Sequence, residues 1–111
     1  MEFSWKIRNL IERLFITMHR IPVDISRIEA SKLSFEQGEV LDGQDSIKKR
    51  SANIHRATHL GNLKHKKVNI LFNTGTEVYK VHTTFWLHYN DEIYLKGNIK
   101  VPVERIIAVN F

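Results

Sequence analysis

The sequence predicts an α+β domain: a small, strongly curved antiparallel sheet, one packed helix, and a further amphipathic helix at the N-terminus. Two observations support this prediction. Two segments before residue 61 repeat apolar residues at spacings of three and four, which is the period of a helix. From Lys66 onward, apolar residues alternate with period two in short runs separated by turn residues, which is typical of strands.

The first helix is predicted over residues 3–18, where Phe3, Ile7, Leu10, Leu14 and Met18 share one face. Pro22 ends it, because proline lacks the N–H that a helix requires. The apolar side could dock on the domain or on a second copy of it, or could lie on a membrane surface. Met18 could also be a second start site. The chain is therefore divided into this helix, residues 1–20, and one domain, residues 25–111.

Residues 25–41 are expected to be extended, with a bulge near Lys32 where the alternation changes phase. Residues 42–45 form a turn that leads into the second helix, with Asp45 as its N-cap. This helix is predicted over residues 46–60. Gly61-Asn62 is expected to end it, since glycine adopts the left-handed conformation at low cost.

Short strands are predicted over residues 68–73, 78–87, 93–95, 99–101 and 106–111, with one tight helical turn at residues 103–105. Strands this short, joined by tight turns, favour a strongly bent sheet. Closing such a sheet removes its exposed edges, so a small barrel of the SH3-like or Sm-like kind fits the length.

The aromatic residues of the strands divide into two expected groups. Trp86 is expected in the core, because Phe85 and Leu87 flank it. Tyr79, Tyr89 and Tyr94 are the candidates for exposed rings. Thr83 and Thr84 are explained by strand propensity and a cross-strand hydroxyl bond.

Composition and motifs indicate a single non-enzymatic domain. The chain has 111 residues, no cysteine and no run long enough to span a bilayer, and we expect a cytoplasmic protein. Asp91 and Glu92 would diverge in a turn, and no nucleophile elbow, phosphate loop or dinucleotide fingerprint is present. We expect no cofactor. His55 and His59 share a helix face, and His65 is the one further candidate ligand nearby. We expect no metal site, because two histidines without further ligands rarely hold one. Whether the three side chains converge is open.

The positive charge is concentrated in one segment. Between Ser46 and Lys67 there are seven basic residues and no acid, so this window carries +7 and the other 89 residues sum to −2, for a net charge of +5. A basic patch of this kind attracts polyanions. The candidate nucleic-acid-binding residues are Lys48, Lys49, Arg50, Arg56, Lys64, Lys66 and Lys67.

Two functions remain open at this point. The first is a binding module whose basic helix contacts RNA or DNA. The alternative is a protein-interaction or self-assembly module with no nucleic-acid ligand, in which the partner is another protein or a second copy of the chain. A membrane partner is not expected.

The stretch from Ala57 to Phe111 resembles a family of short bacterial proteins with no established activity. The matching positions are Leu60-Gly61-Asn62, Lys67-Val68, Thr83-Thr84-x-Trp86, Leu95-Lys96 and Pro102-x-x-Arg105-Ile106-x-x-Val109-x-Phe111. The order of Gly97, Val101-Pro102 and Arg105-Ile106 also resembles the end of an SH3 domain, where a proline precedes one tight turn and the closing strand. The resemblance implies a fold unit and no activity.

Overall fold

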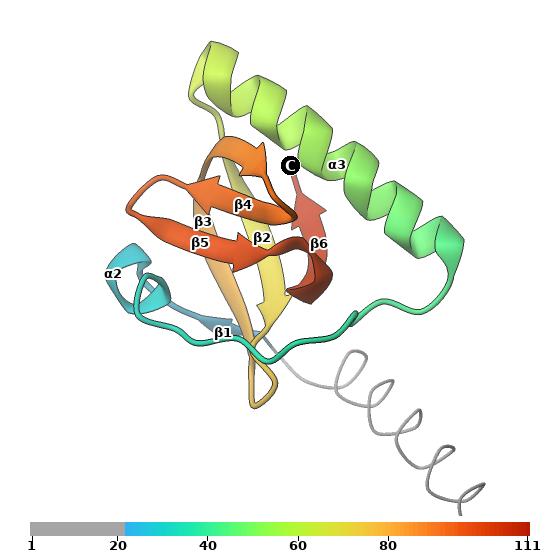
Figure 1. Ribbon diagram of the computed structural model, residues 1–111. Helices are drawn as coiled ribbons and strands as arrows, with labels where there is room; N and C mark the ends of the chain where they lie inside the picture. Colours follow the sequence, from blue (N-terminus) through green and yellow to red (C-terminus); the bar gives the residue numbers. More distant parts are fainter. Residues whose placement is uncertain (1–21) are drawn as a thin grey trace, which may run out of the picture.

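The computed structural model describes residues 22–111, so the helix predicted over residues 3–18, and the unit assigned to residues 1–20, lie outside the described part. Its elements run β1 (Val23–Asp24), α2 (Arg27–Ala30), α3 (Gln44–Lys64), β2 (Lys67–Asn73), β3 (Val78–Tyr89), β4 (Glu92–Leu95), β5 (Ile99–Pro102), η1 (Val103–Arg105) and β6 (Ile106–Asn110). This confirms an α+β fold built on a six-stranded sheet and one main helix (Figure 1).

The sheet is a bent but open path of strands. Its order is β5-β4-β3-β2-β6, all antiparallel, and β1 adds a short parallel pair to β3. The 12-residue β3 joins the two halves: Val78–Thr84 pairs with β2, and Phe85–Tyr89 pairs with β4 after a register shift. Within residues 22–111, the end strands β5 and β6 pair with one neighbour each, so of the two predicted forms the sheet takes the open one and does not close into a barrel.

The alternation that predicted the strands also sets their burial. In β2, Val68, Ile70 and Phe72 are buried, while the residues between them are half-buried. The Phe72 ring lies 5.5 Å from that of Phe35 and 6.1 Å from that of Tyr79, which is the range of favourable aromatic contacts. The predicted helical turn at residues 103–105 is confirmed as η1.

Residues 25–41 are not the extended segment that we predicted. Ser26 caps a four-residue helix: its Oγ accepts a hydrogen bond from the Glu29 N–H and donates one to the Glu29 carboxylate. Serine and glutamate three residues apart are the sequence pattern of a capping box, and Ser26 supplies the serine half of it, while the Glu29 carboxylate bonds to the Ser26 hydroxyl rather than to its backbone N–H. Residues 33–43 then cross the molecule without regular structure.

The second helix is longer than predicted at both ends. Gly43 rather than Asp45 occupies the N-cap position, and His65, with φ 53°, forms the C-cap. Gly61 lies inside the helix, at a point where α3 packs directly on β3. A Cβ on Gly61 would stand 2.1 Å from the Phe85 carbonyl oxygen. Glycine is therefore needed for close approach, not to end the helix.

Candidate nucleic-acid interface

The seven predicted basic residues divide into six at the surface and one in the interior. Lys48, Lys49 and Arg56 are exposed along α3, and Lys64 is its last residue. Lys66 and Lys67 are exposed where the chain enters β2. None of these six forms an ion pair with an acid of the described residues. Together they are called the basic surface below.

Arg50 does not belong to that surface. Its side chain is 4% exposed, and its guanidinium donates hydrogen bonds to both carboxylate oxygens of Glu39, at 2.6 and 2.5 Å, and to the Ile106 carbonyl at 3.1 Å. The prediction that Arg50 contacts nucleic acid is therefore not supported by its position. The physical reason is helical spacing, since Ile47, Arg50, Ile54, Ala57 and Gly61 fall on the face that packs on the sheet.

The Arg50 pair also sets the ionisation of Glu39. Burial raises the pKa of this carboxyl, but the Arg50 hydrogen bonds, the Leu41 N–H and the Arg50 charge together lower it further, so the pKa lies below its ordinary value. Glu39 therefore stays ionised at neutral pH. The pair links the irregular segment before α3 to the helix itself.

The lysine, arginine and histidine side chains of α3 occupy two flanks of its exposed side. Lys48 and His55 are seven residues apart, as are Lys49 and Arg56, and seven residues make nearly two helical turns. The Arg56 guanidinium lies 4.3 Å from the centre of the Phe111 ring, a cation–π contact that holds it beside the end of the chain. From Lys48 to Lys64 the helix spans about 24 Å at 1.5 Å per residue.

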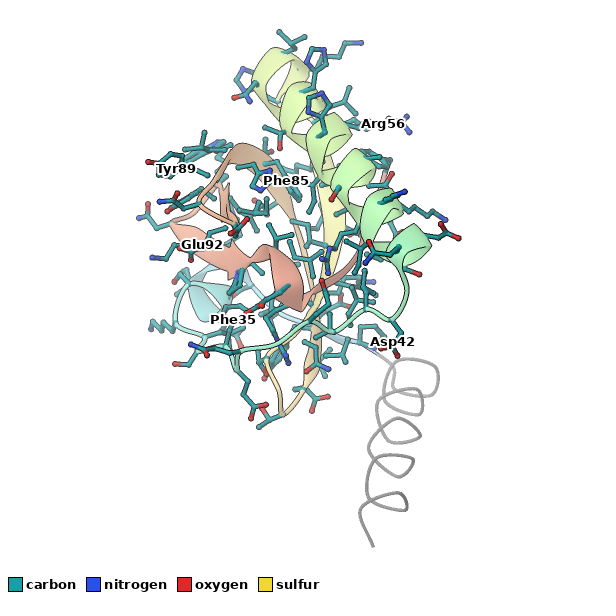
Figure 2. All side chains as sticks on the ribbon, turned by 45° about the vertical axis from the view of Figure 1, so that its right-hand side comes forward. Phe35, Asp42, Arg56, Phe85, Tyr89 and Glu92 are labelled. Atoms are coloured by element: carbon teal, nitrogen blue, oxygen red, sulfur yellow. The ribbon has the colours of Figure 1, made fainter. Side chains whose placement is uncertain are left out.

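Five acids of the described residues gather around one cavity. No Asp or Glu lies between Ser46 and Thr76. A cavity of about 590 Å³ is instead lined by five acids, Glu36, Glu39, Asp91, Glu92 and Glu104. Figure 2 shows Phe35 and Glu92, which line this cavity, well separated from Arg56 on α3. α3 carries one acid, Asp45 in its first turn, so little negative charge offsets the basic surface locally.

The three histidines of this segment all lie at the surface. His55, His59 and His65 are exposed, and the described residues contain no group of three or more His, Asp or Glu side chains placed to hold an ion.

The tyrosines that we expected at the surface are only partly there. Tyr89 is 60% exposed, as predicted, whereas Tyr79 packs against the core.

Trp86 is the residue that our sequence interpretation placed wrongly. It is 48% exposed, and its neighbour Leu87 is 51% exposed. The register of β3 on β4 shifts between Phe85 and Leu87, so Trp86 stands at the irregularity. A bulge redirects the side chains that follow it, and no sequence pattern announces this one.

Comparison of the chain with protein-family models, with curated proteins and with solved structures finds no match. No helix of residues 22–111 is long and apolar enough to cross a membrane. Function must therefore be inferred from the surfaces themselves.

Proposed function

We propose that this protein is a non-enzymatic binding module that binds nucleic acid through the basic surface of α3 and the start of β2. The observation that supports this most directly is the separation of charge. Six exposed cations lie in a segment free of acids, while five acids of the described chain line a cavity elsewhere. Clustered lysine and arginine of this kind bind the phosphate backbone, largely independently of sequence.

The charge comes from side chains rather than from a helix terminus. Lys64, Lys66 and Lys67 lie at the C-terminal end of α3, where the backbone carbonyls carry partial negative charge. These lysines stabilise the helix end and still extend into solvent. The proposal does not depend on an SH3-like or Sm-like barrel, because the sheet is open.

The test is binding of fluorescent RNA and DNA oligonucleotides, followed by anisotropy at 50 and 200 mM salt. With about six phosphate contacts, we expect the affinity to fall by at least 10²-fold over that range. Lys64→Glu/Lys66→Glu should weaken binding by about tenfold or more. The control Lys32→Glu/Lys80→Glu makes the same change of net charge at exposed or half-exposed positions away from the basic surface. It breaks a weak, solvent-exposed ion pair between Lys80 and Asp24, so circular dichroism must first show that it is folded, and it should then bind nearly as the wild type does.

Equal losses in the two double variants would mean that net charge alone, and not the basic surface, drives binding. Binding that does not change with salt would also refute the proposal. If no oligonucleotide binds at 50 mM salt, the protein-interaction alternative becomes the better hypothesis, with the exposed apolar residues of β3 as its surface.

A further inference from the structure

A small cavity opens on the outer face of the β3–β4–β5 half of the sheet. It measures about 350 Å³ and is lined mainly by apolar atoms of Trp86, Tyr94, Leu95, Asn98, Ile99 and Lys100. An aromatic ring, an amide and an ammonium group thus converge on one concave surface. The aromatic ring can stack on a nucleic-acid base, the amide can form hydrogen bonds with the edge of the base, and the ammonium group can neutralise a phosphate.

Strand pairing places these groups together. Tyr94 is opposite Leu87 on one side and opposite Lys100 on the other, so the three side chains share a face of the sheet. Trp86 has no partner in that ladder because the register shifts at its position, and it lines the same cavity as Tyr94. Asn98 lies in the β4–β5 turn with φ 60°, within the same lining.

The cavity is next to the basic surface. Lys67 pairs with Thr84 in the β2–β3 ladder, two residues before Trp86. The Lys96 N–H donates a hydrogen bond of 3.0 Å to the Thr84 carbonyl, and Gly61 of α3 packs on Phe85. Figure 2 shows Phe85 close to the C-terminal half of α3. Lys100 therefore lines the cavity with Trp86, and the backbones of Lys67 and Lys96 both pair with Thr84, two residues before Trp86.

The charges around the cavity favour a polyanion as its occupant. The cavity lining contains one charged residue, Lys100, and no acid, although β4 begins with Glu92 outside the lining. Lys100 lies 3.9 Å from Glu92, and both side chains are partly exposed, so this pairing is weak and leaves Lys100 available.

We infer that this cavity receives an unstacked base of single-stranded nucleic acid, with the base stacked on Trp86 and the flanking phosphates near Lys67, Lys96 and Lys100. This inference rests on the proposed function and narrows it to single strands. A base in a duplex is stacked on both faces and cannot reach the ring, whereas a base of a flexible strand can.

Trp86 itself reports on the inference. The chain has two tryptophans, so Trp5→Phe leaves Trp86 as the single tryptophan, which long-wavelength ultraviolet light excites without exciting the three tyrosines. In that variant we expect a dT or rU oligonucleotide to quench the fluorescence as it binds, because a stacked base quenches indole. Heparin and a DNA duplex should bind the basic surface with little quenching.

The affinity for single strands gives the second readout. Trp86→Ala should weaken single-strand binding by about 10- to 100-fold, from the energy of one stacked base, while heparin binding stays unchanged. Trp86→Phe should recover most of the loss. Tyr89→Ala removes another exposed ring of β3 that does not line the cavity, and it should bind normally. Circular dichroism confirms that each variant is folded.

Each contrary outcome has its own meaning. If heparin, duplex and single strand bind alike and Trp86 is not quenched, the basic surface stands but the base-binding cavity is refuted. If a proline-rich peptide quenches Trp86 and oligonucleotides do not, the cavity serves a protein ligand and the inference is wrong. If no polyanion binds at all, the proposed function and this inference both fail.

Discussion

Gly61→Ala tests the close approach of α3 to β3. By propensity alone the substitution should stabilise the protein by about 1 kcal/mol, because alanine is the better helix former. The structure predicts the opposite. The new methyl carbon would lie 2.1 Å from the Phe85 carbonyl oxygen and 3.1 Å from Cγ2 of Thr84, and the first of these is a backbone atom that cannot rotate away.

The magnitude follows from the retreat that the methyl group forces. An ordinary contact between carbon and carbonyl oxygen is about 3.3 Å, so α3 must move by about 1 Å at this point. A gap of that size forfeits a quarter to a half of each dispersion contact, and Ile54 and Ala57 on the same helix face are fully buried. Overpacking costs about 1–3 kcal/mol, and the loosened contacts add to this. After the propensity gain, we expect a net loss of about 2 kcal/mol.

The assay is thermal unfolding followed by circular dichroism. A loss of about 2 kcal/mol in a domain of this size lowers the Tm by about 8–16 °C. Ala52→Gly, at an exposed position of the same helix, is the matched control and should lose about 1 kcal/mol through propensity alone. If Gly61→Ala is as stable as the wild type or more so, the helix does not pack on β3 as described.

Three further predictions concern the rest of the fold. The Glu39 pKa is lowered in the fold, so its carboxylate stabilises the protein above the unfolded pKa of about 4.3, and this contribution disappears as the pH falls through the folded pKa. In urea unfolding, the stability advantage of the wild type over Glu39→Gln should therefore shrink below about pH 4.5. Asp91→Gly should increase the free energy of unfolding by up to about 1 kcal/mol and so raise the Tm. Asp91 has φ 58°, a left-handed conformation that glycine adopts more easily than aspartate. Phe111→Ala should cost at most about 1 kcal/mol in the same thermal assay, since it removes a cation–π contact with Arg56 at an exposed site.

Each of these has a result that would contradict it. A wild-type advantage over Glu39→Gln that is constant from pH 7 to pH 3 would mean that the Arg50 pair does not hold the carboxylate ionised. Destabilisation by Asp91→Gly would show that its side chain, and not its backbone conformation, matters in the β3–β4 turn. A loss above about 2 kcal/mol for Phe111→Ala would place that ring in the core.

The second half of the chain was predictable because its signals are local. Alternation in β2 and β3, the turn residues between the strands and the proline before η1 each predict a structure within a few residues, and the structure confirms them. The segment before α3 was mispredicted although it carried a signal. Ser26 and Glu29 have the spacing of a capping box, and that spacing should have outweighed an imperfect alternation.

Errors at Arg50 and Gly61 have a different origin. Both residues were interpreted from type: arginine as a surface cation and glycine as a helix end. Their actual roles depend on partners distant in sequence, since Arg50 pairs with Glu39 and Gly61 contacts Phe85. Helical spacing did indicate the buried face, because both fall in register with Ile54 and Ala57. The pattern of positions was informative where the residue types misled.

Trp86 completes this contrast, because no pattern in the sequence could place it. Its neighbours Phe85 and Leu87 are apolar. In a regular strand these two side chains would lie on one face of the sheet and Trp86 on the opposite face. The register shift on β4 breaks that alternation and leaves both Trp86 and Leu87 half exposed. A half-exposed ring gains only part of the free energy that full burial would give. A ligand that stacks on the ring would supply that missing contact. This is why we place the base-binding site there rather than on α3, where the charges alone lie.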